Sequence, residues 1–390
     1  MAQQAAQSHV GTRSASTPSS RPVVALVSCS KKHVSDLGPT LLSLASHAPA
    51  GTRVVLFADA VGRNAASACA SHLFQPPALP PLELLPIEAL GATLPDYDAK
   101  KGPNPKAQGR FACASAKLML QGAPALRDEP FVLALDVDTL VNEPLWDLWH
   151  RWTASMARQQ SPEALWGLVQ ESGADEPLTF GQELRDVRPA AIKREDYFNT
   201  GVILIHAAAL RRRNLTHPAA LLAHLSPAAL HGRSKYDDFG LGEQNLLNAW
   251  LQDHPGHTAT LPCRWNRRID RRCAEERPGV RHANRLLGKP RDWEATDQRL
   301  LGLLRSDAAG PLTPAPAARL PPRPPSRLEA AWPEAACGDA QLRTEWRGNA
   351  SAARECAYLM AKRWARDDVE PWHRRYRALP CAAAPAASAR

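Results

Sequence analysis

The chain has 390 residues, 44% of them hydrophobic and 22% charged, which is enough for one large domain or two ordinary ones around a sizeable core. Its formal net charge is +9, but residues 1–22 carry two arginines and no acid, and residues 319–390 carry 13 basic and 8 acidic side chains. The central part is therefore near neutral, and without a basic groove or a nucleic-acid motif we expect no nucleic-acid partner. The sequence has no run of 18 apolar residues, so no transmembrane segment is predicted in this chain.

Eight cysteines are spread along the chain without a CxxC pair, which argues against zinc. Cys263 and Cys273 are ten residues apart, so a local disulfide is feasible in length if the protein is secretory. Residues 1–21, rich in Ser, Ala and Gln and free of acids, are expected to be a disordered or targeting leader outside the fold. Seven prolines between 311 and 325 predict an extended linker over 306–327, before a C-terminal helical tail over 328–390 that contains Trp and Cys.

The first part of the chain alternates between apolar strands and helical patterns. Strands are predicted over 23–28, 53–57 and 82–87, with a helix around 37–44 and another that ends near Leu73. This succession predicts a βαβ sheet with right-handed crossovers and with its loops at one edge. A basic loop follows over 95–110, and a helix over 111–120 is expected to place Lys117 near the next strand.

That next strand, over 131–135, ends in two carboxylates, Asp136 and Asp138. Ligands of open α/β sheets bind beyond the carboxyl ends of the strands. Either aspartate or both could hold a hard divalent cation that in turn holds phosphate oxygens. The alternative is that Asp136 merely ends a strand and Asp138 begins an ordinary turn, because D-x-D is a short motif.

Polar residues also accompany the later predicted elements. A helix starting near Pro144, a strand over 165–169 and a polar loop over 170–195 precede a strand over 198–205. Asn199, Thr200 and Gly201 open that strand and would let its backbone approach a ligand closely, unless they form a simple turn.

Two more groups complete the candidate set. Glu243 and Gln244 begin an amphipathic helix, where they point into a cleft or complement the helix dipole. After a predicted strand that ends at Trp265 and Asn266, His282 is a candidate third metal ligand or an ordinary histidine, with Lys289 nearby to meet phosphate.

Six phrases, in this order, resemble the family 8 retaining glycosyltransferases, and within them the glucoside xylosyltransferase branch. They are residues 111–118, 135–139, 198–202, 242–248, 261–266 and 282–285. The resemblance covers about residues 23–293 and implies a GT-A domain over 22–305. That fold is α/β, with a Rossmann-like mixed sheet flanked by helices.

The resemblance also implies the ligands. The donor would be UDP-xylose or UDP-glucose, with Mn²⁺ bridging the diphosphate, and the acceptor a glycan or glycoprotein. The setting would be the Golgi lumen of the secretory pathway. Oxygen and imidazole ligands suit Mn²⁺, and a cation that stabilises the departing diphosphate lowers the barrier to glycosidic cleavage.

The family's site positions map onto this chain residue by residue. Metal ligands are matched by Asp136, Asp138 and His282, and the positions of substrate binding around the donor by Lys117, Asn199, Thr200, Gly201, Asn284 and Lys289. Glu243 and Gln244 match catalytic positions, with the role of positioning and of stabilising the oxocarbenium-like centre and not of attack.

The chain departs from the family's pattern in two places. The family's usual Asp-Gln-Asp is Glu243-Gln244-Asn245 here, and Lys117 stands where an Arg is common. These changes bear on sugar choice and rate, and they keep open a non-catalytic relative that binds a sugar nucleotide or a glycan. A phosphatase of the haloacid-dehalogenase type is a further alternative, but it requires a Thr two residues after the second Asp, whereas Thr139 follows Asp138 directly.

Overall fold

The computed structural model describes residues 21–28, 31–74, 81–90, 115–159, 162–170, 197–227, 243–268 and 279–282. The predicted leader, linker and tail, the basic loop over 95–110 and the polar loop beyond Gln170 lie outside these residues. The predicted domain boundaries therefore stay a prediction.

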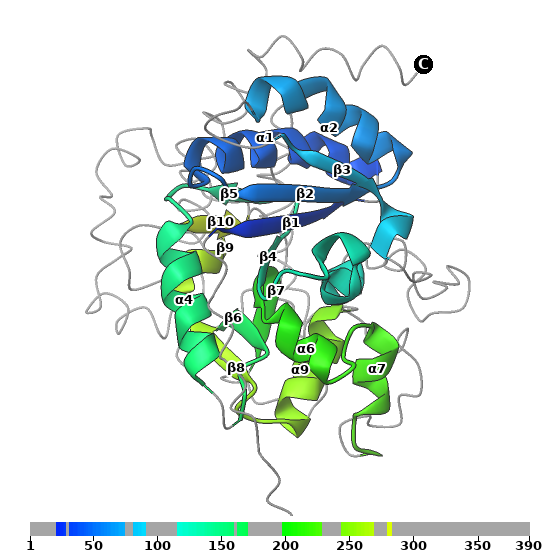
Figure 1. Ribbon diagram of the computed structural model, residues 1–390, viewed down its shortest axis with the longest axis vertical. Helices are drawn as coiled ribbons and strands as arrows, with labels where there is room; N and C mark the ends of the chain where they lie inside the picture. The colour runs from blue at the N-terminus through cyan, green and yellow to red at the C-terminus, as the bar shows by residue number, and fades with distance from the viewer. Residues whose placement is uncertain are drawn as a thin grey trace, which may run out of the picture.

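A seven-stranded mixed sheet forms the centre of the described chain, in the order β3-β2-β1-β4-β7-β6-β8 (Figure 1). Its parallel half consists of β1 (Val23–Ser28), β2 (Arg53–Ala58), β3 (Glu83–Pro86) and β4 (Val132–Leu135). β7 (Phe198–Ile205) runs antiparallel to β4 and to β6 (Trp166–Gln170), and β8 (Thr258–Leu261) runs parallel to β6. The apolar runs of β1 and β4 are buried throughout, as expected for strands that are covered on both faces.

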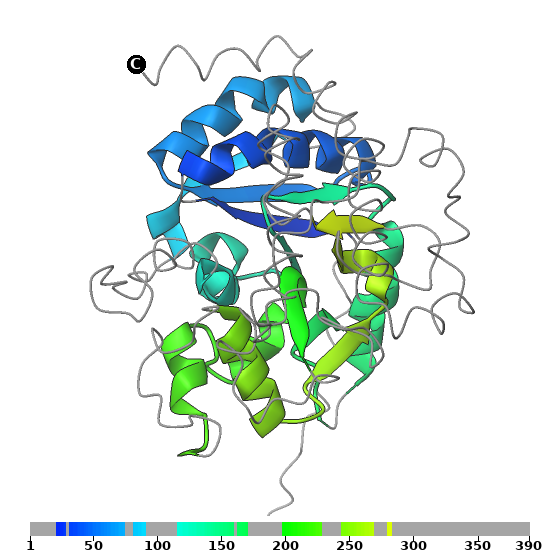
Figure 2. The same cartoon turned by 180° about the vertical axis from the view of Figure 1, so that it is seen from behind.

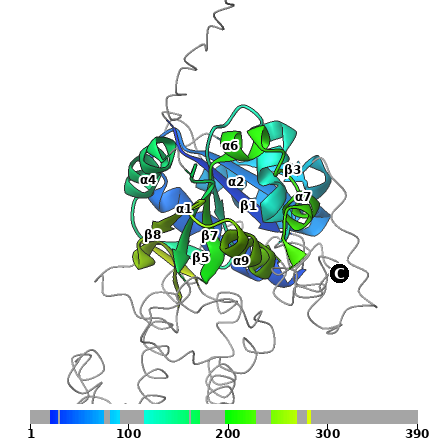
Figure 3. The same ribbon diagram turned by 90° about the horizontal axis from the view of Figure 1, so that it is seen from below.

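Helices cover the sheet as the alternating pattern predicts. α1 (Lys31–His47) and α2 (Ala60–Leu73) lie together on one side of the parallel strands, which Figure 2 shows from behind. Asp59, at the end of β2, is the N-cap of α2, and its Oδ1 accepts a hydrogen bond of 2.7 Å from Gly62 N. α4 (Trp146–Arg158) and α7 (Pro218–Ala223) lie on opposite sides of the described part of the molecule (Figures 1 and 3). α6 (Ala207–Arg212) comes directly after β7 in the chain, and α9 (Glu243–Asp253) packs against β7.

Two predicted elements have a different form in the structure. The described part of the helix expected over 111–120 is mainly a 3-10 helix, η2 (Lys117–Gly122), followed by η3 (Pro124–Leu126). Pro124 has no amide hydrogen and forces Ala123 into an extended conformation, so an α-helix cannot continue through this point. The strand expected to run into Asn266 ends at Leu261, and Cys263–Asn266 form the 3-10 helix η6. Short 3-10 turns also appear at η1 (Ile87–Leu90).

A second, three-stranded sheet lies beside the end of β4. It has the order β5-β10-β9, with β5 (Thr139–Val141), β10 (Val280–His282) and β9 (Arg267–Arg268). His282 pairs with Thr139 in the antiparallel register of β10 and β5. Gly279 is needed just before β10, because a Cβ there would lie 2.4 Å from the buried ring of Trp265.

Among the described helices, none is both long and apolar enough to cross a membrane.

Candidate functional site

The Asp136–Asp138 segment is the turn that leads from β4 into β5. The amide and hydroxyl of Thr139 both bond to Asp136 O, at 3.2 and 2.7 Å, which closes the turn. From α1, Thr40 Oγ1 lies 2.6 Å from Val137 O and 2.8 Å from Thr139 O. The two carboxylates are therefore carried on a turn that is tied both to itself and to a helix about 100 residues earlier in the chain.

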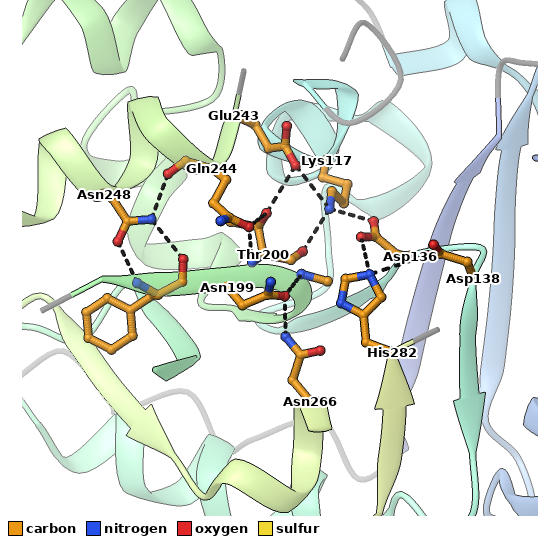
Figure 4. A network of polar contacts seen from close by, with 12 residues as sticks. Lys117, Asp136, Asp138, Asn199, Thr200, Glu243, Gln244, Asn248, Asn266 and His282 are labelled. Carbon is orange, nitrogen blue, oxygen red and sulfur yellow. Dashed lines mark hydrogen bonds and ion pairs between the residues drawn. The ribbon is translucent and has the colours of Figure 1, made fainter. Parts of the chain in front are cut away.

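His282 completes a group of three metal-ligand side chains with these aspartates (Figure 4). Its Nε2 lies 3.5 Å from Asp136 Oδ2 and 3.4 Å from Asp138 Oδ1, and one ligand atom from each residue lies within 4.8 Å of the others. The side chains of His282 and Asp138 are 8% and 12% exposed. Two carboxylates and an imidazole converging in a poorly hydrated space fit a divalent cation, and their oxygen and nitrogen donors suit Mn²⁺ among others.

Gly201 is required by the position of this histidine. A Cβ on Gly201 would lie 2.3 Å from His282 Nδ1 and 3.0 Å from Asn199 Oδ1. The sequence suggests that the glycine lets a ligand approach the backbone, whereas the structure fills that space with the imidazole ring. No partner for the buried Nδ1 is present among the described residues.

Lys117 joins the metal-ligand group to the start of α9. Its Nζ donates to Asp136 Oδ1 at 2.6 Å and to Thr200 O at 2.7 Å, and lies 3.3 Å from Glu243 Oε1. Burial lowers the pKa of Lys117, but the carboxylates of Asp136 and Glu243 raise it by more, so the net pKa lies above its usual value. The 2% exposed ammonium therefore stays charged. It holds Asp136 Oδ1, while Oδ2 of that carboxylate faces His282.

Glu243 has a buried carboxylate whose two oxygens differ in their hydrogen-bond partners. Oε1 accepts from Thr200 Oγ1 at 3.1 Å and faces Lys117, whereas Oε2 is buried with no partner among the described residues. Burial raises the pKa of Glu243, Lys117 lowers it and Asp136 raises it, with a net shift upward. The predicted alternative in which Glu243 simply complements a helix dipole does not account for these contacts with Lys117 and Thr200.

Gln244 is held at both ends of its amide. Its Oε1 lies 3.2 Å from both Thr200 N and Thr200 Oγ1, and its Nε2 donates to Tyr197 OH at 3.1 Å. Tyr197 in turn donates to Asn245 Oδ1 at 2.6 Å. These bonds fix the first turn of α9 against the first residues of β7.

Asn199 points to the other side of β7. Its Oδ1 accepts from Gly201 N at 2.8 Å and from Asn266 Nδ2 at 2.6 Å. This contact links η6 to the strand, and it places Asn199 away from Glu243 and Gln244 (Figure 4).

The structure therefore brings together most of the predicted site residues: Asp136, Asp138 and His282 in one group, and Lys117, Thr200, Gly201, Glu243 and Gln244 around it. Asn284 and Lys289 lie outside the described residues. The sequence analysis did not select Thr40, Tyr197, Asn245, Asn248 or Asn266 as site residues. Three of them, Asn245, Asn248 and Asn266, lie within the phrases that carry the family resemblance.

Comparison with known proteins gives a family for this part of the chain. Residues 130–279 match the model of glycosyl transferase family 8, a span that holds both aspartates, β7 and α9. The human xylosyl- and glucuronyltransferase LARGE2 is 32% identical over 147 residues, which cover 37% of this chain. The chain spans 18% of the length of that relative.

Two solved structures resemble this chain at lower sequence identity. Mouse xyloside xylosyltransferase 1 in its apo form has a TM-score of 0.47 at 18% identity, over 68% of this chain and 97% of that one. The galactosyltransferase LgtC in complex with donor and acceptor sugar analogues has a TM-score of 0.45 at 18% identity, over 76% of this chain and 98% of that one.

The predicted fold class is confirmed as an α/β fold with a mixed sheet flanked by helices. The predicted family resemblance is confirmed for the part of the chain that matches: residues 130–279 are similar to the model of glycosyl transferase family 8.

Proposed function

We propose that the chain is a metal-dependent retaining glycosyltransferase that moves a sugar from a UDP-sugar to a glycan or glycoprotein acceptor. The observation that carries this proposal is the Asp136, Asp138 and His282 group, which is assembled at the end of β4 beside the family 8 phrases. Such a group at the carboxyl end of a strand is where an open α/β sheet binds its ligands.

Asp136, Asp138 and His282 would hold the cation, and Mn²⁺ is proposed because mixed oxygen and imidazole ligands suit it. A bound divalent cation neutralises charge that develops on the departing diphosphate. Lys289 and Asn284 are proposed to contact the pyrophosphate side of the donor, on the evidence of their phrase in the sequence.

The remaining residues are proposed to shape and hold the donor-sugar side. Lys117 keeps Asp136 and Glu243 in place from a buried position, and Thr200 bonds to Glu243 through its hydroxyl. Because Gln244 Oε1 faces two donors of Thr200 and its Nε2 donates to Tyr197, we assign Gln244 to positioning and electrostatic stabilisation and not to attack.

For the donor sugar we propose xylose first and glucose second. The support is the likeness to the segment of LARGE2, which is named for xylosyl and glucuronyl transfer. Glu243 is the residue that we expect to bear on this choice, because its longer carboxylate replaces the family's usual Asp and its buried Oε2 has no partner in the part of the chain that the structure describes.

We also propose that the protein works in the lumen of the secretory pathway, in the Golgi. Cys263 is disulfide-bonded. Structural disulfides persist in oxidising compartments and are rare in the cytosol, which supports this setting.

The test is hydrolysis and transfer from a panel of UDP-sugars with and without Mn²⁺. We expect turnover that requires the metal and that falls at least about 100-fold in Asp138→Asn, since loss of outer-shell partners alone costs 10- to 100-fold. Asp128→Asn is the matched control, because this side chain is 90% exposed and forms a surface ion pair with Arg127 at 3.6 Å.

Two other outcomes would redirect the assignment. Binding of UDP without turnover on any donor and acceptor would support a non-catalytic sugar-nucleotide-binding relative. Release of phosphate from phosphomonoesters, without dependence on a UDP-sugar, would contradict the proposal and support a phosphatase.

A further inference from the structure

β7 is interrupted at the residues that carry the site. On the β6 side, Leu168 pairs with Ile203, but the next residue, Val169, pairs with Asn199, so residues 200–202 have no pairing partner in β6. On the β4 side, the ladder ends with Leu135 opposite Val202. The segment Thr200–Gly201 is thus a bulge against β6, and on the β4 side the backbone bond from Asp136 N to Gly201 O is the continuation of the ladder.

This bulge is also where the site groups are attached. Thr200 N faces Gln244 Oε1 at 3.2 Å, Thr200 O accepts from Lys117 at 2.7 Å, and Gly201 O accepts from Asp136 N at 2.8 Å. A change of backbone register here would move Thr200 and Gly201 relative to all three partners.

Just before the bulge, the side chain of Asn248 takes the place of a neighbouring strand. Its Oδ1 accepts from Phe198 N at 2.7 Å and its Nδ2 donates to Phe198 O at 2.9 Å. The second hydrogen of Nδ2 goes to Gln244 O at 2.7 Å, one turn earlier in α9 (Figure 4). Asn248 is completely buried, so water cannot substitute for these bonds.

We propose that Asn248 is a positioning residue of the transfer reaction, which clamps the first residues of β7 to α9 and so fixes Thr200 against Gln244, Glu243 and Lys117. This role rests on the proposed glycosyltransferase function, although the clamp itself can be measured without turnover. Asn248 touches none of the three candidate metal ligands in the contacts described, so the clamp acts on the donor-sugar side of the site.

The decisive variant is Asn248→Asp, which keeps the volume and shape of the side chain. The aspartate would still accept from Phe198 N, but it would place a carboxylate oxygen against two carbonyl oxygens, those of Phe198 and Gln244. If Asn248 only fills space, kcat and hydrogen exchange should not change in Asn248→Asp. If its hydrogen bonds clamp β7 to α9, kcat should fall and exchange should accelerate.

Asp253→Asn is the matched control, because it is the reverse exchange at the far end of the same helix. Asp253 accepts from Ser226 N at 2.5 Å and from Ser226 Oγ at 2.7 Å. Asn266→Asp is a second test variant, because it removes the donor to Asn199 Oδ1 on the opposite side of the bulge.

For Asn248→Asp we expect kcat for the best UDP-sugar to fall about 10- to 100-fold, as for a small misplacement of reacting groups. The Mn²⁺ dissociation constant should change less than about threefold, because distant sites behave independently. Hydrogen exchange should accelerate in residues 198–201 and stay unchanged in residues 203–205, which remain in the ladder with β4. Asn266→Asp should show the same pattern of exchange, and Asp253→Asn should leave kcat and this pattern unchanged.

A kcat of Asn248→Asp within twofold of the wild type, or unchanged exchange at 198–201, would overturn the proposal. So would an equal loss of kcat in Asp253→Asn, since that would indicate general damage to α9. Absence of turnover in the wild type would count against the proposed function, while the exchange measurement would still report on the clamp. If Asn248→Asp does not fold, the exchange pattern and kcat of Asn248→Ala decide in the same way, because this variant removes the bonds to Phe198 and Gln244 without adding a buried charge.

Discussion

Replacing Lys117 by methionine would remove the cation buried between Asp136 and Glu243 while keeping most of the apolar stem. The ammonium contacts Asp136 Oδ1 at 2.6 Å, Thr200 O at 2.7 Å and Glu243 Oε1 at 3.3 Å. In the variant all three oxygens lose a charged donor at once.

The size of the effect follows from what each acceptor can recover. The side chain of Asp136 is 28% exposed and can be rehydrated, whereas that of Glu243 is 5% exposed and cannot. Breaking a buried ion pair by removal of one partner costs about 3–5 kcal/mol. We therefore expect a loss of about 3 kcal/mol in the free energy of unfolding, most of it from the uncompensated Glu243.

The loss should also depend on pH. The folded-state pKa of Glu243 lies above its usual value, so its contribution to stability is present below the unfolded pKa and is lost as the pH rises through the folded pKa. Lys117 lowers that folded pKa, so its removal raises the pKa further. The destabilisation by Lys117→Met should therefore be larger at about pH 8 than at about pH 5.

Urea unfolding followed by tryptophan fluorescence measures both quantities. Glu243→Gln and the double variant complete a double-mutant cycle, in which we expect the double variant to be more stable than the sum of the single losses by about 1–3 kcal/mol. A loss below about 1 kcal/mol, an additive cycle or a loss that is equal at both pH values would refute the buried ion pair as the organising contact of this site.

Gly201→Ala should displace the ring of His282, since the new Cβ would lie 2.3 Å from Nδ1, and we expect Mn²⁺ affinity measured by calorimetry to fall at least about tenfold. Gly62→Ala, whose Cβ would meet Ala58 Cβ at 3.0 Å and Asp59 Oδ1 at 3.3 Å, is the comparison, and equal affinities in the two variants would disprove the role of Gly201. Burial lowers the pKa of His206, so its neutral form is favoured by folding, and the associated stability is present above pH 6.5 and lost on acidification. In His206→Gln the melting temperature should therefore decrease less below that pH than in the wild type. An unchanged pH profile of the melting temperature would contradict the role of the buried, neutral His206.

Several features of the fold follow from local pattern. The boundaries of β1 and β7 agree with the predicted strands, 23–28 and 198–205, because most of each strand is apolar and buried on both faces. The same reasoning places Asp136 and Asp138 just beyond a strand, and the turn between β4 and β5 carries them there.

Other features depend on packing that no short window of sequence contains. The sequence Asn199-Thr200-Gly201 suggests that a ligand approaches the backbone at the glycine, yet the ring of His282 occupies the space beside Gly201. Asn248 reads as an ordinary polar position of an amphipathic helix, and its bonds to Phe198 exist because β7 bulges at the point where β4 has ended.

The order of apolar runs and the candidate ligand residues were thus readable from the chain alone, because burial and metal chemistry select residue types locally. The assembly of the site was decided by tertiary structure. Asp136 and His282 come together through the register of β10 against β5, in which His282 pairs with Thr139. Lys117 reaches both carboxylates because η2 begins at this residue, beside the turn after β4 and the start of α9, and such long-range pairings are set by the packing of the whole core.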